Sequence, residues 1–346
     1  MSVLCSLLAS STLLLSSPPD VKAELKAFAD LCGALGWSGT LYVEKNGKVL
    51  LERSLGFADI AEQRVLEPED VMELASITKV ITAVAVVQLH EDGKLNLDQP
   101  ISTYLEGLGE AHTKITVRHL LSHTSGMRRM AKTGWGEDRS QAVAGYLQDA
   151  PTSPPGERSE YWNGGYALLA AIVEEVTSGT FEDYVAAKIF QPAGMKSATF
   201  VGADLSPEEQ AMGYELGSRS RLTCTHPYPD GGAWSYKGMG GAVCTAKDLA
   251  RFATAFAKGK LVKKSLVKEM TSQVADDQGL GWRLNTDAGE DLWMHGGDVA
   301  GFHSWLEYVP EDKLAVVVMG NRSGSPQYTC TRPVTASRRR WEDAET

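Results

Sequence analysis

The sequence predicts an α+β fold, in which an antiparallel sheet is flanked by helices and a mostly helical region is inserted between its strands. Near the N-terminus, two extended runs (residues 40–44 and 49–57) are joined by Asn46-Gly47, the strongest short signal for a β-hairpin. The middle of the chain is dominated by apolar residues at helical spacing. Extended runs return near the C-terminus, at residues 292–295, 302–309 and 314–319. One sheet built from both ends of the chain is the simplest architecture that accommodates this order.

Start and stop signals delimit the helices. Asp20 is a good N-cap for a helix over residues 21–35, and Gly36 ends it. Thr245 begins a later helix with a sequence that resembles a capping box. The remaining helices are expected from Ser76 to Asp92-Gly93, over residues 117–122 and 166–177, over 181–190 with a stop before Pro192, after Ser206, and over 264–272.

The first 23 residues resemble a secretory signal. An apolar stretch (residues 3–15) is followed by small residues and by a cleavage site of the small-residue type after Ala23. We therefore expect a secreted or periplasmic protein, with the cytoplasm as the alternative because the basic start is missing. The stretch is shorter than the ~20 apolar residues of a spanning helix, and no later stretch qualifies.

The rest of the chain divides into one domain and a tail. Residues 24–322 are expected to form a domain with a sheet part (about 24–75 and 242–322) and a helical part (about 76–241). Residues 323–346 lack an amphipathic pattern and are expected to form an irregular tail.

Composition narrows the function. With 346 residues, 43% apolar content and a formal net charge of −10, the chain is globular and a poor partner for nucleic acid. Its five cysteines lack metal-ligand spacing. After removal of a signal, Cys32, Cys224, Cys244 and Cys330 either pair or stay reduced, and the sequence leaves both open. It does not specify an oligomeric state.

The stretch from Ser76 to Lys79 is the first candidate for chemistry. Residues three apart lie on one face of a helix, so the Lys79 amine can reach the Ser76 hydroxyl and take its proton. The spacing alone is weak, because Ser265 and Lys268 repeat it inside a helix expected at the surface. Ser76 differs because it precedes a long apolar run, whose buried N-terminus would offer N–H groups to an oxyanion.

Two further motifs follow in order: Tyr161-Trp162-Asn163 before a helix, and His295-Gly296-Gly297, then Asp298, at the end of an expected strand. With Ser76-Ile77-Thr78-Lys79 they resemble the three motifs of the serine β-lactamase and penicillin-binding protein superfamily. Within it the chain is most similar to class C β-lactamases, D-alanyl-D-alanine carboxypeptidases and family VIII carboxylesterases. Residues 119–127, 164–169 and 240–245 resemble other recurrent segments of this group, and the resemblance covers about residues 25–321.

The resemblance implies a β-lactamase-like fold, with the active site in a cleft between the sheet and the helical part, and no cofactor or metal. Ser76 would form an acyl-enzyme, Lys79 would share its proton, and Tyr161 would be the second proton carrier. Asn163 would hold the substrate and Lys79. The backbone N–H groups of Ser76 and Asp298 would form the oxyanion hole.

The third motif departs from the usual Lys-Thr-Gly. His295 replaces a permanent positive charge, and Gly296 replaces a hydroxyl residue, so both contacts to a substrate carboxylate are weakened. We therefore expect an esterase, with D-alanyl-D-alanine carboxypeptidase or weak β-lactamase activity as the alternative. A non-catalytic β-lactam-binding or peptidoglycan-binding homologue is the alternative of another class. The expected partner is thus a small ester, amide or peptidoglycan-like molecule.

The same residues also have purely structural interpretations. Tyr161 and Asn163 could cap the helix that follows, and His295 could be an ordinary strand-end histidine. His119 and His123 are four residues apart, but no glutamate follows His119 as a zinc motif requires. Family members usually close with a helix across the sheet, and residues 323–346 show no such helix pattern.

Overall fold

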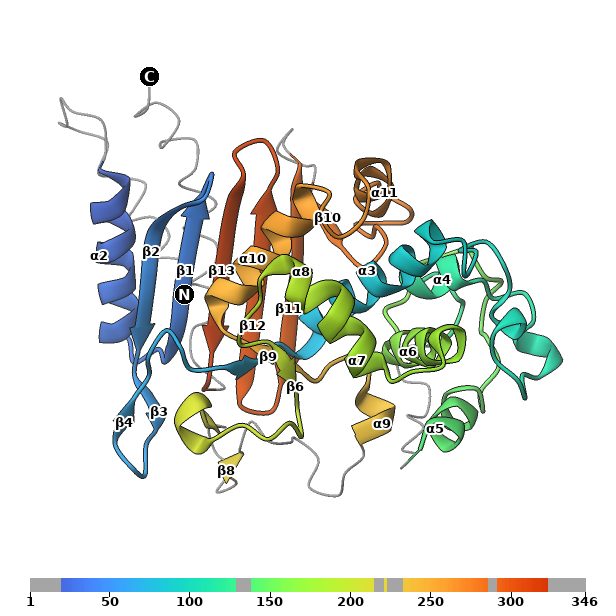
Figure 1. Cartoon of the computed structure of the whole chain (residues 1–346), viewed down its shortest axis with the longest axis horizontal. Helices are drawn as coiled ribbons and strands as arrows, with labels where there is room; N and C mark the ends of the chain where they lie inside the picture. The colour runs from blue at the N-terminus through green and yellow to red at the C-terminus, as the bar shows by residue number, and fades with distance from the viewer. Residues whose placement is uncertain (1–19, 129–137, 215–220, 223–232, 286–290, 323–346) are drawn as a thin grey trace.

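The computed structural model describes residues 20–128, 138–214, 221–222, 233–285 and 291–322. Its frame is a six-stranded antiparallel sheet of order β10-β11-β12-β13-β1-β2 (Figure 1). The first hairpin joins the late strands through β1 and β13, which pair from Gly39 with Gly320 to Lys45 with Leu314. The two ends of the chain therefore form one sheet, and the predicted α+β fold is confirmed. The strands are β1 (Gly39–Lys45), β2 (Lys48–Leu55), β10 (Arg283–Asn285), β11 (Leu292–Val299), β12 (Phe302–Val309) and β13 (Leu314–Gly320).

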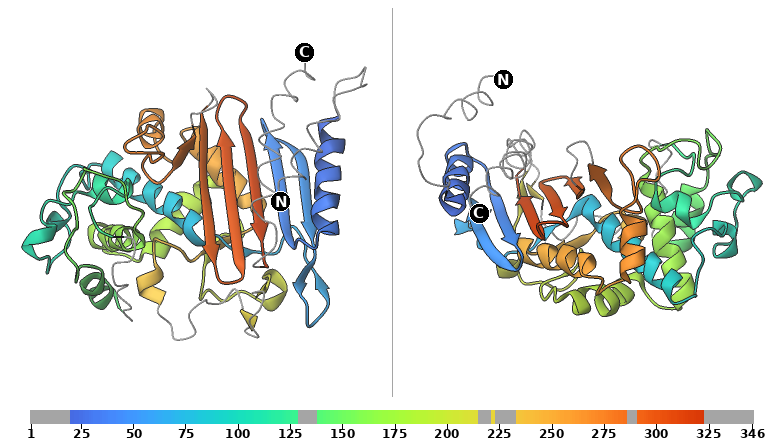
Figure 2. Two further views of the ribbon diagram at one scale, coloured as in Figure 1. Left: turned by 180° about the vertical axis from the view of Figure 1, so that it is seen from behind. Right: turned by 90° about the horizontal axis from the view of Figure 1, so that it is seen from above.

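Both faces of the middle of the sheet are covered. Helix α2 (Val21–Ala34) lies against one face, and α10 (Ala246–Ala257) packs against the other (Figure 2). Strand β13 shows the consequence, since all of its residues are buried. Successive side chains of a strand point to opposite faces, so Val316 packs in the cluster under α2 and Val317 in the main core. This explains why β13 reads as a continuous apolar run instead of an alternating one.

Helix α3 (Thr78–Glu91) connects the sheet to the helical part (Figure 1). Nearly every residue from Thr78 to Leu89 is buried, which explains an apolar sequence on all sides of the helix. Around it lie α4 (Val117–Leu121), α5 (Arg139–Tyr146), α6 (Asn163–Thr177), α7 (Phe181–Val185), α8 (Gln191–Ala193), α9 (Ala233–Tyr236) and α11 (Lys264–Met270).

A small three-stranded sheet places distant segments beside the start of α3. Its order is β5-β9-β6, formed by β5 (Met72–Glu73), β9 (Ala242–Cys244) and β6 (Thr199–Phe200). Strand β9 thereby brings the glycine-rich stretch before it next to the residues that precede Ser76. The other short strands are β3 (Phe57–Asp59), β4 (Arg64–Val65), β7 (Gly213–Tyr214) and β8 (Arg221–Leu222).

Several expected boundaries were wrong, each for a local reason. Ser76 does not open the α-helix, because it lies in a 3₁₀ turn (Ala75–Ile77) and α3 begins at Thr78. The helical run from Phe181 does not stop before Pro192. It passes through a π turn (Ala186–Phe190) into α8. Pro192 lies in the first turn of α8, where the N–H group that proline lacks would have no partner within the helix. After Ser206 only a 3₁₀ turn forms, at Pro207–Glu209.

The strand expected to end at His295 continues to Val299, so the His-Gly-Gly-Asp motif lies within β11. The two glycines resemble a turn in the sequence, but both pair across the sheet, Gly296 with Trp305 and Gly297 with Ser304. Edge strand β10, which pairs with the start of β11, was not predicted. Its three residues are too short to show a period.

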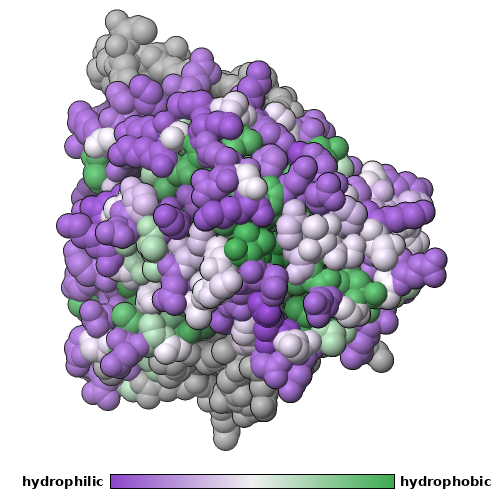
Figure 3. All heavy atoms as spheres, turned by 45° about the vertical axis from the view of Figure 1, so that its right-hand side comes forward, coloured by the Kyte–Doolittle hydropathy of each residue, from purple (hydrophilic) through white to green (hydrophobic). Residues whose placement is uncertain are grey.

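Some expectations fall on residues outside the description. Residues 1–19 of the expected signal and residues 323–346 of the expected tail lie there, as do Cys224 and Cys330. Cys32 and Cys244 are buried, and neither forms a disulfide within the described residues. Residues 21–23 form the first turn of α2, which Asp20 caps. Within the described ranges, no helix combines the length and hydropathy that crossing a membrane requires. Hydrophilic residues cover most of the face in Figure 3, with hydrophobic ones in small groups.

Candidate active site

Ser76 is presented by a tight turn at the head of α3. The preceding residue, Ala75, has a φ of 47°, a left-handed conformation that costs a residue with a side chain about 1 kcal/mol or more. A hydrogen bond to β9 holds the turn in place, because the Leu74 N–H donates to the Ala242 carbonyl at 2.8 Å. Ser76 itself is half-buried and lines the cleft. A strained, well-anchored turn of this kind is typical of functional positions.

Lys79 lies one turn further on and is completely buried. Its Nζ donates to the Ser76 Oγ at 2.9 Å and to the Met239 carbonyl at 2.7 Å. No carboxylate of the described residues pairs with Lys79, and burial lowers the pKa of its amine from the ordinary value, with nearby Tyr161 acting in the opposite direction. The site therefore favours an uncharged amine beside the serine hydroxyl.

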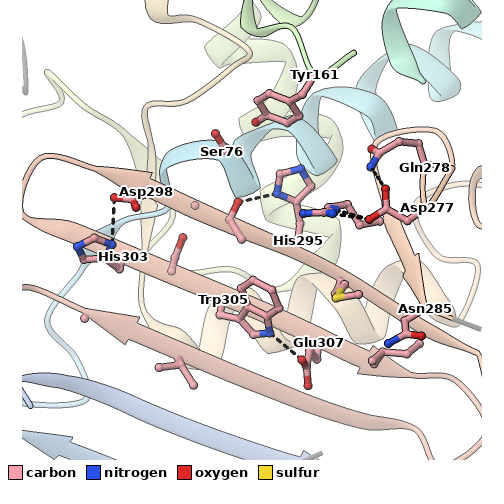
Figure 4. A pocket seen from close by; sticks show the side chains of 18 of the residues that line it. Ser76, Tyr161, Asp277, Gln278, Asn285, His295, Asp298, His303, Trp305 and Glu307 are labelled. Carbon is pink, nitrogen blue, oxygen red and sulfur yellow. Dashed lines mark hydrogen bonds and ion pairs between the residues drawn. The ribbon is translucent and has the colours of Figure 1, made fainter. Parts of the chain in front are cut away.

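Tyr161 lies in the loop before α6, and its hydroxyl points toward Ser76 (Figure 4). The Lys79 Nζ is 5.1 Å from the centre of the Tyr161 ring. Asn163, the first residue of α6, is exposed and lines the same cleft. The expected hydrogen bond between Asn163 and Lys79 is absent from the described structure, and the Met239 carbonyl accepts from Lys79 instead.

The middle of β11 lies against the Ser76 turn. A Cβ atom at Gly297 would lie 2.1 Å from the Leu74 carbonyl oxygen and 3.0 Å from the Ser76 nitrogen, so only glycine fits there. From the neighbouring strand, the Ser304 Oγ donates to the same Leu74 carbonyl at 2.6 Å. Gly296 faces the other way, where a Cβ would meet the Trp305 ring at 2.8 Å. The two glycines thus allow close contact on both faces of the strand.

His295 is buried on β11 below Ser76 and Tyr161 (Figure 4). Its Nδ1 is 2.8 Å from the Gly296 carbonyl oxygen, which can only accept, so the hydrogen bond assigns the proton to Nδ1. Burial is the main cause that lowers the pKa of His295 to about 3, against the opposing effect of the hydrogen bond with Gly296. His295 is therefore neutral near neutral pH, and its Nε2 has a lone pair and no proton.

A cavity of about 930 Å³ contains these groups. It is also lined by Trp305, whose side chain lies on the opposite face of β12 from Ser304, so the lining includes residues of both faces of the sheet. Its charged side chains are largely paired. The Arg283 Nε donates to Asp277 at 2.8 Å, and the His303 Nδ1 is 3.0 Å from the Asp298 carboxylate, which is 65% exposed.

The two histidines considered for zinc have other roles. The His119 Nδ1 accepts from the Thr116 N–H at 3.2 Å within a capping box. The His123 Nδ1 accepts from the Trp162 N–H at 3.1 Å. The described residues contain no group of three or more side chains placed to hold a metal ion.

The structure brings the predicted residues Ser76, Lys79, Tyr161, Asn163 and His295 together, and the backbone of residues 296–298 lies beside them. Sequence reasoning missed the Met239 carbonyl, Ser304 and the place of His123. Met239 adjoins Gly240-Gly241, a segment that resembled the family, but nothing in the sequence pointed to a carbonyl. The contacts of Ser304 depend on the pairing of β11 with β12.

The family model described as Beta-lactamase matches residues 31–336. The chain belongs to this family. Penicillin-binding protein 4* of Bacillus subtilis (strain 168) is 27% identical over 84% of the chain and 70% of its own length. The octameric penicillin-binding protein homologue from Pyrococcus abyssi is 25% identical, with a TM-score of 0.80 over 92% of this chain and 77% of that one. The chain spans between 59% and 71% of the length of the first three curated relatives that it matches.

The D-amino acid amidase from Ochrobactrum anthropi SV3 shares the fold, with a TM-score of 0.78 at 22% identity over 94% of this chain and 99% of that one. Family membership and the Ser76–Lys79 geometry identify this β-lactamase family member as an enzyme of the serine hydrolase type. They place it in the serine β-lactamase and penicillin-binding protein superfamily.

Proposed function

We propose that this serine hydrolase cleaves carboxylic esters through an acyl-enzyme on Ser76, and that its preferred acyl groups bear no carboxylate. The observation that supports this choice is the neutral, buried His295 at the position where the family usually has a lysine. A substrate carboxylate at this position would lose its hydration and gain no opposite charge. An ester without a charged group avoids that cost.

The chemistry follows from the contacts of Ser76. An uncharged Lys79 amine, 2.9 Å from the Ser76 Oγ, accepts the hydroxyl proton as Oγ attacks the ester carbonyl. The tetrahedral oxyanion would be bound by the backbone N–H groups of Ser76 and Asp298. Collapse breaks the bond to the alcohol, which leaves with the proton of the Tyr161 hydroxyl. Water then attacks the acyl-enzyme and gives a proton to the Tyr161 oxygen, while Lys79 returns its proton to the Ser76 Oγ as the acid is released.

The charges of the cleft agree with this preference. Arg283 is engaged by Asp277, and the Asp298 carboxylate lies at the cleft together with His303. The Glu307 Oε1 accepts from the Trp305 Nε1 at 2.8 Å. These groups give the lining of the cleft more negative than positive charge, which disfavours anionic substrates.

The test compares two p-nitrophenyl esters, the butyrate and the monoester of glutaric acid, which differ chiefly by a terminal carboxylate. We expect kcat/KM at pH 7.5 to be higher for the butyrate by ~10-fold or more. Intact-mass measurement should show an acyl adduct in the wild type and none in Ser76→Ala. Adducts that persist in Ser76→Ala would remove the nucleophile assignment. A higher kcat/KM for the glutarate would remove the substrate assignment.

The second candidate is hydrolysis of a D-alanyl peptide or slow turnover of a β-lactam. It is favoured by the similarity to penicillin-binding protein 4* and to the octameric penicillin-binding protein homologue. Incubation with a penicillin and with a D-Ala-D-Ala peptide, followed by mass measurement, tests both. Secretion or a periplasmic location stays our proposal from residues 3–23, and fractionation of cells that express the full chain tests it.

A further inference from the structure

His123 is a buried histidine next to the active site to which the proposed chemistry assigns no role. It is 3% exposed and lies in the Ser-His-Thr-Ser-Gly stretch that follows α4. Its φ is 57°, in the left-handed region that histidine adopts more often than most residues but still rarely. A buried polar residue in a strained conformation is usually held there by specific contacts.

Those contacts surround Tyr161. The His123 carbonyl accepts from the Glu160 N–H at 2.8 Å, and the His123 Nδ1 accepts from the Trp162 N–H at 3.1 Å. One residue therefore binds the backbone on both sides of Tyr161. The imidazole also lies against the Tyr161 ring, with 4.4 Å between ring centres and an angle of 32° between planes.

A second aromatic ring also lies near the imidazole. The centre of the Tyr166 ring is 5.1 Å from it, and the Tyr166 hydroxyl donates to the Leu121 carbonyl at 2.8 Å. Because the His123 Nδ1 accepts a hydrogen bond from a backbone N–H, it has no proton, and the neutral ring holds its proton on Nε2. Burial lowers the pKa of His123 well below its ordinary value, in agreement with a neutral ring.

We propose that His123 is a positioning residue, which fixes the place and tilt of the Tyr161 ring relative to Ser76 through its Nδ1, its carbonyl and the contact of its ring with the Tyr161 ring. The inference rests on the proposed role of Tyr161 as a proton carrier. A proton carrier must stay within about 3 Å of the atom that it serves, and a displacement of about 1 Å can lower a rate ~10²-fold.

The test uses two substitutions that both accept a positive φ. His123→Asn places its Oδ1 at the same point along the side chain as Nδ1, so it can accept from the Trp162 N–H. His123→Gly keeps the backbone conformation without any acceptor. We expect kcat/KM for p-nitrophenyl butyrate to fall ~10²-fold in the glycine variant and less than ~10-fold in the asparagine variant.

A control separates positioning from general destabilisation. Tyr166→Phe removes the hydrogen bond to Leu121 but keeps the ring against His123, so it should lower the melting temperature and leave kcat/KM within ~3-fold of the wild type. If His123→Gly does not fold, His123→Leu replaces it as the variant without an acceptor. Equal losses in the asparagine variant and the variant without an acceptor would overturn the inference, as would full activity of the latter.

A substrate-independent measurement keeps this inference distinct from the proposed function. A fluorophosphonate loses fluoride as its phosphorus bonds to Ser76 Oγ, whose proton leaves with the fluoride, and intact mass follows the rate. We expect the order wild type, His123→Asn, His123→Gly for this rate. If the three proteins react with the fluorophosphonate at rates in that order but the wild type does not cleave esters, the proposed function fails and the inference stands. If the order is absent, the inference fails whatever the substrate.

Discussion

Replacing Gly297 with alanine tests how tightly β11 must approach the Ser76 turn. The added Cβ would lie 2.1 Å from the Leu74 carbonyl oxygen and 2.4 Å from the Ser304 Oγ, whereas an ordinary contact needs at least ~3.4 Å. The strand and the turn must therefore separate by about 1 Å, which widens the site between them. One oxyanion donor is worth about 3 kcal/mol, so kcat/KM for p-nitrophenyl butyrate should fall ~10²-fold or more.

The matched control is Gly39→Ala in the same sheet. Its Cβ would meet the Met319 carbonyl oxygen at 2.2 Å, a similar clash with a backbone oxygen, but Gly39 lies on β1 and not beside Ser76. Both variants should lose about 1–3 kcal/mol of stability from overpacking, and Gly39→Ala should lose more because Gly39 has a φ of 155°, which residues with a side chain rarely adopt. Only Gly297→Ala should lose activity per folded molecule. A Gly297→Ala enzyme within ~3-fold of the wild type would refute the close-approach reasoning.

Four shorter predictions follow from burial and charge. Lys79→Met should abolish ester turnover yet raise the melting temperature, because it replaces a fully buried amine; a lower melting temperature would contradict this. Ser265→Ala, in the exposed second copy of the spacing, should leave turnover unchanged, and a loss in the same ester assay would make that copy functional. His295 titrates at about 3 in the fold, below its unfolded value, so stability falls as pH drops below about 6.5. Urea unfolding should show His295→Asn losing less stability than the wild type over that range, by about 1.4 kcal/mol per pH unit. The contribution of Glu73 to stability depends on pH in the opposite direction, because burial raises the pKa of this carboxyl to about 7. Glu73→Gln should therefore gain stability relative to the wild type as pH rises from about 4.5 to 7, and a constant difference would count against it.

The expected fold was recovered because its signals are local. The Asn46-Gly47 hairpin and the N-cap at Asp20 depend on neighbouring residues, and each is found where the sequence put it. Boundaries failed where packing overrides local preference. The glycines of the third motif continue a strand because the Trp305 ring and the Leu74 carbonyl leave no room for side chains, and β10 exists only because β11 pairs with it.

In the candidate site, too, some contacts follow from local sequence and others only from packing. Ser76 and Lys79 meet because a spacing of three residues suffices in any helical turn, and the order of the three motifs predicted which distant residues would join them. The contact of Lys79 with the Met239 carbonyl spans 160 positions of the chain, and the two hydrogen bonds of His123 around Tyr161 span two loops. No local pattern encodes such contacts.

The sequence by itself determined the candidate nucleophile, the spacing to its amine neighbour and the absence of the usual third-motif lysine. The tertiary structure decided the charges of the site. Lys79 and His295 both tend toward the neutral form because the fold removes them from water, and at His295 the charge of Asp277 only partly opposes this effect. Solvent exposure is a property of the packed chain, so the protonation of these two groups, on which the proposed substrate depends, is fixed only when the sheet and the helices come together.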